Sequence, residues 1–91
     1  MIAPNDIIYL DNNATTRIDP AVVEEMRPFL EQYYGNPSSG YGFGAQVRVA
    51  IDLARDRVAA LVGCAPNEII FTSCGTEASH TAIHSALQLD P

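Results

Sequence analysis

The sequence predicts an α/β protein that is mostly helical within these residues, with one or two short strands. Apolar residues recur every three or four positions in two segments, as they do on one face of a helix. Two short β-rich runs lie far apart, and the second leads through a turn of small residues into a helical segment. Because two brief, distant strands do not make an independent sheet, we expect one corner of a larger α/β protein.

Composition limits the function classes. Ninety-one residues, 47% of them apolar, are enough for one domain with a core. The net charge of −6 argues against nucleic acid and acidic membrane surfaces as partners. The sequence contains neither an apolar run of about 18 residues nor the pattern of a signal peptide, so we expect a cytoplasmic protein. Cys64 and Cys74 form no CxxC motif, and we expect both to be reduced thiols.

The N-terminal half predicts a strand, a turn and a helix. The first β-rich run is Ile7–Leu10, and the polar segment Asp11–Thr16 follows it. Short Asx and threonine side chains satisfy local backbone groups, so this segment is expected to form a turn. A helix is predicted to begin with Asp19 as its cap and Pro20 at its first position. Pro28 lies well inside this helical pattern, and we expect a kink or a break there.

The middle of the chain predicts a loop and a long helix. The segment Tyr34–Gly44 holds four of the six glycines. It is either a flexible connector or a loop whose backbone closely approaches a ligand or a second subunit, and the pattern does not distinguish the two. The clearest helical periodicity follows over Phe43–Val62, and Gly63 is expected to end that helix, with Pro66 shortly beyond.

The strongest functional signal lies near the C-terminal end. A β-like run, Ile69–Thr72, ends in a small polar turn, and a helix-compatible segment follows. This order places unpaired N–H groups and the positive end of a helix dipole where Gly75 leaves room, an arrangement that attracts phosphate. The hydroxyls of Ser73 and Thr76 are candidate donors to the same anion. An ordinary strand–helix connection with a serine or threonine cap explains the pattern equally well.

Two further features concern metal and covalent chemistry. His80 and His84 lie four residues apart on a predicted helix, a spacing that metal ligands use, but no third ligand accompanies them and we expect no metal site. All basic residues are arginines, so the chain contains no lysine. Chemistry that needs an ε-amino group therefore cannot come from these residues.

Three motifs occur in order along the chain: YLDNNATT (Tyr9–Thr16), GNPSS (Gly35–Ser39) with Phe43-Gly44, and FTSCGTEA (Phe71–Ala78). Together they make the chain resemble the N-terminal part of the pyridoxal-phosphate-dependent cysteine desulfurases of the nitrogen-fixation and iron–sulfur-cluster type. These enzymes belong to the class V aminotransferase family. The resemblance covers nearly the whole chain, and three motifs in register are far more specific than any one of them.

The resemblance implies the aspartate-aminotransferase fold and a homodimeric transferase. Such enzymes take sulfur from L-cysteine, leave alanine and a persulfide, and supply a sulfur-acceptor scaffold protein for iron–sulfur cluster assembly. Gly75 and Thr76 match the residues that contact the phosphate of pyridoxal 5′-phosphate in the family. The segments 14–16 and 35–39 resemble segments that line the active-site entrance or meet the other subunit.

The chain also departs from the family pattern. The family often has histidine where this chain has Tyr41, and a small polar residue where it has His80. The family's cofactor-bound lysine, ring-stacking histidine, pyridine-nitrogen aspartate and persulfide cysteine have no match here, so no catalytic residue is assigned. We therefore expect these residues alone to be inactive and to bind the cofactor weakly or not at all.

The expected organisation is a single N-terminal segment of a larger enzyme. It divides into an extended arm over 1–16, a helical part over 17–66 and the start of the cofactor-binding large domain over 67–91. Two other functions remain open. One is another class V enzyme, such as a selenocysteine lyase or an aminotransferase, and the other is a non-enzymatic interaction module that docks through its apolar faces.

Overall fold

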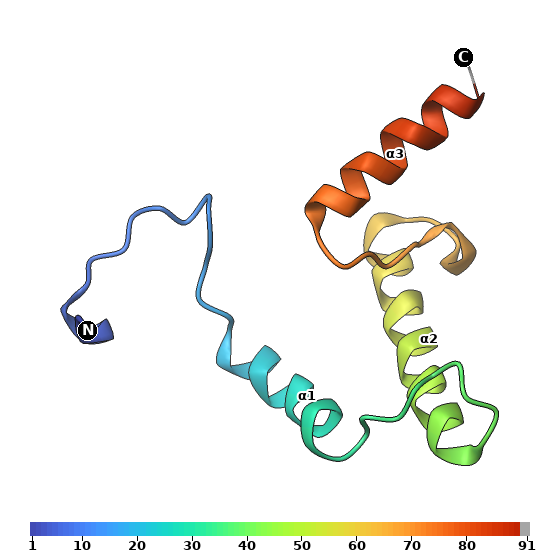
Figure 1. Cartoon of the computed structure of the whole chain (residues 1–91), viewed down its shortest axis with the longest axis horizontal. Helices are drawn as coiled ribbons and strands as arrows, with labels where there is room; N and C mark the ends of the chain where they lie inside the picture. Colours follow the sequence, from blue (N-terminus) through green and yellow to red (C-terminus); the bar gives the residue numbers. More distant parts are fainter. Residues whose placement is uncertain (90–91) are drawn as a thin grey trace. The chain divides into compact units, whose positions relative to one another are not determined.

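The computed structural model describes residues 1–89 as helices joined by turns and extended segments (Figure 1). In chain order these are the 3-10 helix η1 (Pro4–Asp6), α1 (Pro20–Glu31), α2 (Gly42–Val62), the 3-10 helix η2 (Pro66–Glu68) and α3 (Gly75–Leu89). The chain divides into two compact units, Met1–Val47 and the residues from Arg48 onward. The expected mostly helical character is confirmed.

Helix α1 begins where the sequence predicts. The N–H of Ala21 donates to Asp19 Oδ1 at 2.8 Å, and Pro20 occupies the first helical position, where a missing N–H leaves no bond unmade. The break expected at Pro28 does not occur, because the helix continues to Glu31. Pro28 removes its own intrahelical N–H bond, and its ring crowds the carbonyl four residues earlier, yet the helix tolerates both.

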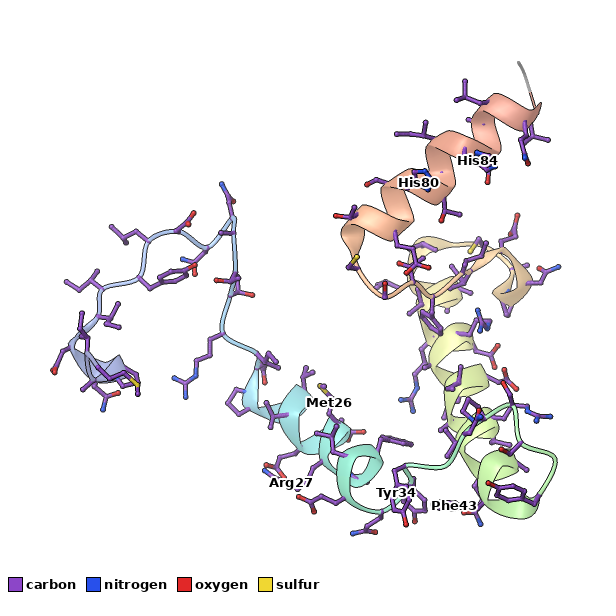
Figure 2. All side chains as sticks on the ribbon, viewed as in Figure 1. Met26, Arg27, Tyr34, Phe43, His80 and His84 are labelled. Atoms are coloured by element: carbon purple, nitrogen blue, oxygen red, sulfur yellow. The ribbon has the colours of Figure 1, made fainter. Side chains whose placement is uncertain are left out.

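The glycine-rich segment packs onto the start of α2. A Cβ on Gly44 would collide with the backbone oxygen of Asn36 and lie 2.9 Å from that of Ser39. The N–H of Ser39 donates to the carbonyl of Asn36 at 3.0 Å. The rings of Tyr34 and Phe43 meet edge to face, with centroids 5.2 Å apart (Figure 2). The close backbone approach predicted from the glycines is thus made within the chain itself.

Helix α2 ends as predicted, at a glycine in the left-handed region. Gly63 has φ of +77°, a conformation that residues with a Cβ rarely adopt. The N–H groups of Gly63 and Cys64 both donate to the carbonyl of Ala59, at 2.8 and 3.0 Å. These bonds satisfy a carbonyl that the end of the helix would leave unpaired. Helix η2 follows, and Glu68 Oε2 accepts the N–H of Ala65 at 2.7 Å.

The two expected strands require a correction. Within residues 1–89 the structure contains no hydrogen-bonded strand. The backbone at the two sites is nevertheless extended, with φ and ψ of −102° and 125° at Ile7 and −95° and 126° at Ile69. A strand exists only when a neighbouring strand pairs with its N–H and C=O groups. The first residue of each run is thus extended, as its β propensity favours, but no pairing partner lies in the described part of the chain.

Apolar burial is small. Val47 and Ala59 are the only buried apolar side chains among the described residues. The apolar face predicted for α1 is exposed, with Val22, Met26, Phe29 and Leu30 each more than a third accessible. The core that the composition allows is thus not built within these residues. No helix in the described range combines the length and hydropathy needed to cross a membrane.

Candidate anion-binding site

The two residues predicted to bind phosphate lie at the start of α3. An extended segment from Ile69 leads into the turn, and Cys74 lies immediately before the helix, its carbonyl accepting the N–H of Ala78 at 3.1 Å. Gly75 and Thr76 are the first two residues of α3. Their N–H groups therefore lie in the first turn, where no preceding helical carbonyl is available to accept from them.

The turn fits an oxyanion. Within residues 1–89, no backbone or side-chain oxygen accepts a hydrogen bond from the N–H of Gly75 or Thr76. A Cβ built on Gly75 would meet no atom within 4 Å, so the space beside this backbone is open. Unpaired donors at the positive end of a helix dipole attract negative charge. Gly75 and Thr76 thus have both the donors and the room that a phosphate group needs.

The hydroxyl of Ser73 was a candidate donor to the anion, but in the structure it bonds to a side chain of α3. The hydroxyl of Ser73 donates to Glu77 Oε2 rather than standing free, and the N–H of Ser73 donates to the same oxygen at 2.7 Å. Both bonds lower the pKa of Glu77 below its ordinary value, and the bond from the Ser73 hydroxyl has the larger effect. A charged carboxylate therefore shares the helix N-terminus with any bound anion. The four-residue spacing of Ser73 and Glu77 was the only sequence signal for this pair.

Cys74 also faces the open turn. Its side chain is exposed, and the thiol is free. The backbone N–H of Glu77 lowers the pKa of the Cys74 thiol, followed by the hydroxyl of Ser73 and, more weakly, the N–H of Thr76. Thiolates are favoured at helix N-termini because the same donors stabilise the negative sulfur. The sulfur of Cys74 and a phosphate would therefore compete for donors in this turn.

A groove runs beside the turn. It has a volume of about 250 Å³ and is lined mainly by apolar surface from the extended segment and from α3: Glu68, Ile70, Thr72, Ala78, Thr81, Ala82 and Ser85. None of these side chains is basic, so the donors for an anion come from the backbone of the turn.

His80 and His84 lie on one side of α3 (Figure 2). Their rings are stacked, with centroids 6.2 Å apart and planes inclined by 8°. Nε2 of His84 lies 3.0 Å from the side-chain nitrogen of Gln88. In the part of the chain that the structure describes, no group of three or more histidine, cysteine, aspartate or glutamate side chains is arranged to hold a metal ion.

The other two motif segments form turns. In the first, the N–H of Ala14 donates to the carbonyl of Asp11 at 3.1 Å, and the hydroxyls of Tyr9 and Thr15 lie 2.6 Å apart. The turn expected there is confirmed. In the second, the N–H of Ser38 donates to Asn36 Oδ1 at 2.9 Å. Short polar side chains thus bond to nearby groups in both segments.

The family follows from sequence comparison. Residues 8–91 match the family described as Aminotransferase class-V. The chain belongs to the class-V aminotransferase family. A cysteine desulfurase of Enterobacter agglomerans is 60% identical to this class-V chain over 85 residues, which are 92% of the chain and 21% of that protein. The cysteine desulfurase NifS of Azotobacter vinelandii is 53% identical over 85 residues, again 92% of the chain and 21% of that protein.

A comparison with solved structures supports the same family assignment. A protein named NifS-like matches with a TM-score of 0.70 and 50% identity, over 72% of this chain and 18% of that one. The resemblance inferred from the three motifs and the expected fold class are therefore confirmed. This class-V chain spans about a fifth of the length of the curated relatives, 21% in both cases above.

Proposed function

We propose that this chain forms the phosphate-binding turn of a pyridoxal-phosphate-dependent cysteine desulfurase. Relatives that are 53% and 60% identical are named cysteine desulfurases. The observation that carries the proposal is that no oxygen of the described residues accepts from the N–H groups of Gly75 and Thr76, which lie beside open space at the start of α3. Family and local chemistry thus point to the same ligand group.

Each residue of the turn has a distinct role in this proposal. The N–H groups of Gly75 and Thr76 hold the phosphate, and the hydroxyl of Thr76 adds a third donor. Glu77 keeps Ser73 folded against the helix start, which holds the turn in shape. When bound, the cofactor supplies the electron sink needed to break the carbon–sulfur bond of L-cysteine.

The wider assignment is also a proposal. The longer enzyme would be a cytoplasmic homodimer that converts L-cysteine to alanine and passes the sulfur to a scaffold protein for iron–sulfur cluster assembly. Residues 1–16 would form an arm, 17–66 a helical part, and 67–91 the start of the cofactor-binding domain. Because these residues include no lysine, they would hold the cofactor only through non-covalent contacts and would not desulfurate cysteine alone.

One observation favours a second candidate, a non-enzymatic interaction module. Large apolar side chains are exposed on all three α-helices, such as Leu30, Leu61 and Leu87. Exposed apolar surface of this extent is typical of surfaces that bind another protein. Light scattering separates the candidates, because a defined oligomer that is insensitive to pyridoxal phosphate would favour the module.

The proposal is tested with pyridoxine 5′-phosphate, which carries the phosphate but no aldehyde and so cannot react with an amine. Titration with each ligand, followed by isothermal titration calorimetry, is expected to show weak but saturable binding of the phosphate ester, whereas pyridoxine without the phosphate is expected to show none. Thr76→Val should weaken binding because it removes the hydroxyl donor but keeps the side-chain shape. Equal behaviour of the two ligands would mean that the turn does not recognise phosphate.

A further inference from the structure

Arg55 connects α2 to the segment that leads into the candidate site. Its guanidinium Nη1 donates to the carbonyl of Ile69 at 2.5 Å. Its Cζ lies 4.8 Å from the ring centroid of Phe71. The side chain is half-buried, in contrast to the exposed Arg57 on the same helix. Arg55 therefore contacts the extended segment at two points, one on its backbone and one on a side chain.

These contacts restrain the extended segment within the described residues. No neighbouring strand pairs with the segment from Ile69 to Thr72 within the described residues. A charged donor makes a stronger hydrogen bond to a carbonyl than a neutral N–H does. The face of an aromatic ring also attracts a guanidinium, and Arg is suited to making both contacts because its group is planar. Two attachment points restrict both the sliding and the rotation of the segment.

The restriction reaches the turn through consecutive contacts. Phe71 is followed by Thr72, whose hydroxyl donates to the carbonyl of Cys74 at 3.1 Å. The next residue, Ser73, is bonded to Glu77 in the first turn of α3. Every residue from 71 to 74 is thus tied either to Arg55 or to the helix start. The backbone that enters the turn has no unrestrained residue between the two.

From this arrangement we infer that Arg55 is a positioning residue, which orders the N-terminal turn of α3 so that the N–H groups of Gly75 and Thr76 converge on one phosphate. The inference rests on the proposed phosphate site for its functional part. Its structural part, the ordering of the turn, stands apart from any ligand. Arg55 does not touch the anion, and its effect is on the shape of the backbone that does.

Arg55→Met tests the inference, because it keeps much of the length of the side chain and removes the guanidinium. Without ligand, hydrogen exchange is followed at Ser73 and Ala78, whose N–H groups are bonded across the turn. Exchange at both is expected to become about tenfold faster, since a hydrogen bond to a charged group is lost. Arg57→Met is the matched control and should leave both rates unchanged.

The ligand measurement adds the functional part. Arg55→Met is expected to weaken binding of pyridoxine 5′-phosphate about tenfold. Arg55→Lys keeps the charge and N–H donors but loses the planar group, so its affinity should fall between wild type and Arg55→Met. Such partial rescue indicates positioning, because a general loss of folding would not follow the chemistry of the side chain. Circular dichroism checks that helical content is equal in all variants.

The outcomes separate the two claims. If wild type binds the phosphate ester no better than pyridoxine, the proposed function fails, and the exchange rates alone then decide the role of Arg55. Unchanged exchange and unchanged affinity in Arg55→Met overturn the inference. If Arg55→Met loses helical content as a whole, Phe71→Leu decides instead, since it removes the ring contact but keeps the bond to Ile69. Exchange as slow in Phe71→Leu as in wild type would then count against the inference.

Discussion

Gly44 and Gly75 both lie in the first turn of an α-helix, but they differ in what surrounds them. The position of a Cβ on Gly44 is already filled by backbone atoms of Asn36 and Ser39. The same position on Gly75 has no atom within 4 Å. Glycine is therefore required at the first site for packing within the chain, whereas at the second it leaves space beside unpaired N–H groups. A turn of small residues in the sequence indicates that some group lies close to its backbone, but it does not show whether that group is the chain itself or a ligand.

The polar groups of the two regions differ in the same way. Around α2, Asn36 accepts from Ser38 through its side chain and from Ser39 through its backbone. Around α3, Ser73 and Glu77 satisfy each other, while Gly75 and Thr76 keep their N–H groups free of oxygen acceptors in the described residues. The first region is closed by its own contacts, and the second keeps donors available. Four experiments test this difference.

The largest effect is expected from alanine at the two glycines. Gly44→Ala should destabilise the chain by about 1–3 kcal/mol, because the new methyl group collides with backbone atoms, which cannot avoid it by changing rotamer as a side chain could. Gly75→Ala is the matched variant and should be neutral or stabilise by about 0.4–1 kcal/mol, since it restricts the unfolded chain and meets no atom. Urea unfolding followed by helical circular dichroism measures both. Equal losses in the two variants would remove the distinction between them.

A smaller effect is expected at Asn36. Asn36→Ala removes the side-chain oxygen that accepts from Ser38 and should cost about 1 kcal/mol, the net value of a typical hydrogen bond. The same unfolding measurement applies, with Asn67→Ala as the control, because Asn67 is exposed and lies outside this loop. If both variants unfold alike, the Asn36 turn does not close the region as argued.

The pH dependence of the α3 turn comes next. The pKa of Glu77 is lowered in the folded chain, so its bonds to Ser73 stabilise the turn fully above the ordinary glutamate value of 4.5. That stability should be lost as pH falls from there through the lowered folded value. Hydrogen exchange at Ser73 between pH 6 and the acid range measures it. Glu77→Gln should flatten this dependence, whereas Glu25→Gln should not; a flat profile in wild type would contradict the argument.

The smallest effect concerns the two thiols. Cys74 should react with iodoacetamide several-fold faster than Cys64, because its thiol is exposed and its pKa is lowered by N–H donors at the helix start. Pyridoxine 5′-phosphate should slow the reaction of Cys74, since it competes for the same donors, and should leave Cys64 unaffected. Mass spectrometry of the alkylated peptides reports both rates. Protection of both thiols alike would indicate a general effect rather than binding in the turn.

The amino-acid sequence by itself determined the elements that depend on near neighbours. The start of α1 at Asp19-Pro20 and the end of α2 at Gly63 were predicted correctly, since caps act over a few residues. The extended backbone at Ile7 and Ile69 was also predicted, because local propensity favours it. The family followed from three motifs whose order is visible in the chain alone.

Only the tertiary structure decided which hydrogen-bonding groups have a partner within the chain and which remain available to a ligand. Ser73 was expected to face a ligand and instead bonds Glu77, and the expected strands have no pairing partner in the described residues. Arg55 and Ile69 are 14 residues apart, so no local sequence pattern predicted the hydrogen bond between them. Secondary structure depends on bonds between neighbours in sequence, whereas the availability of a donor depends on everything that folds against it.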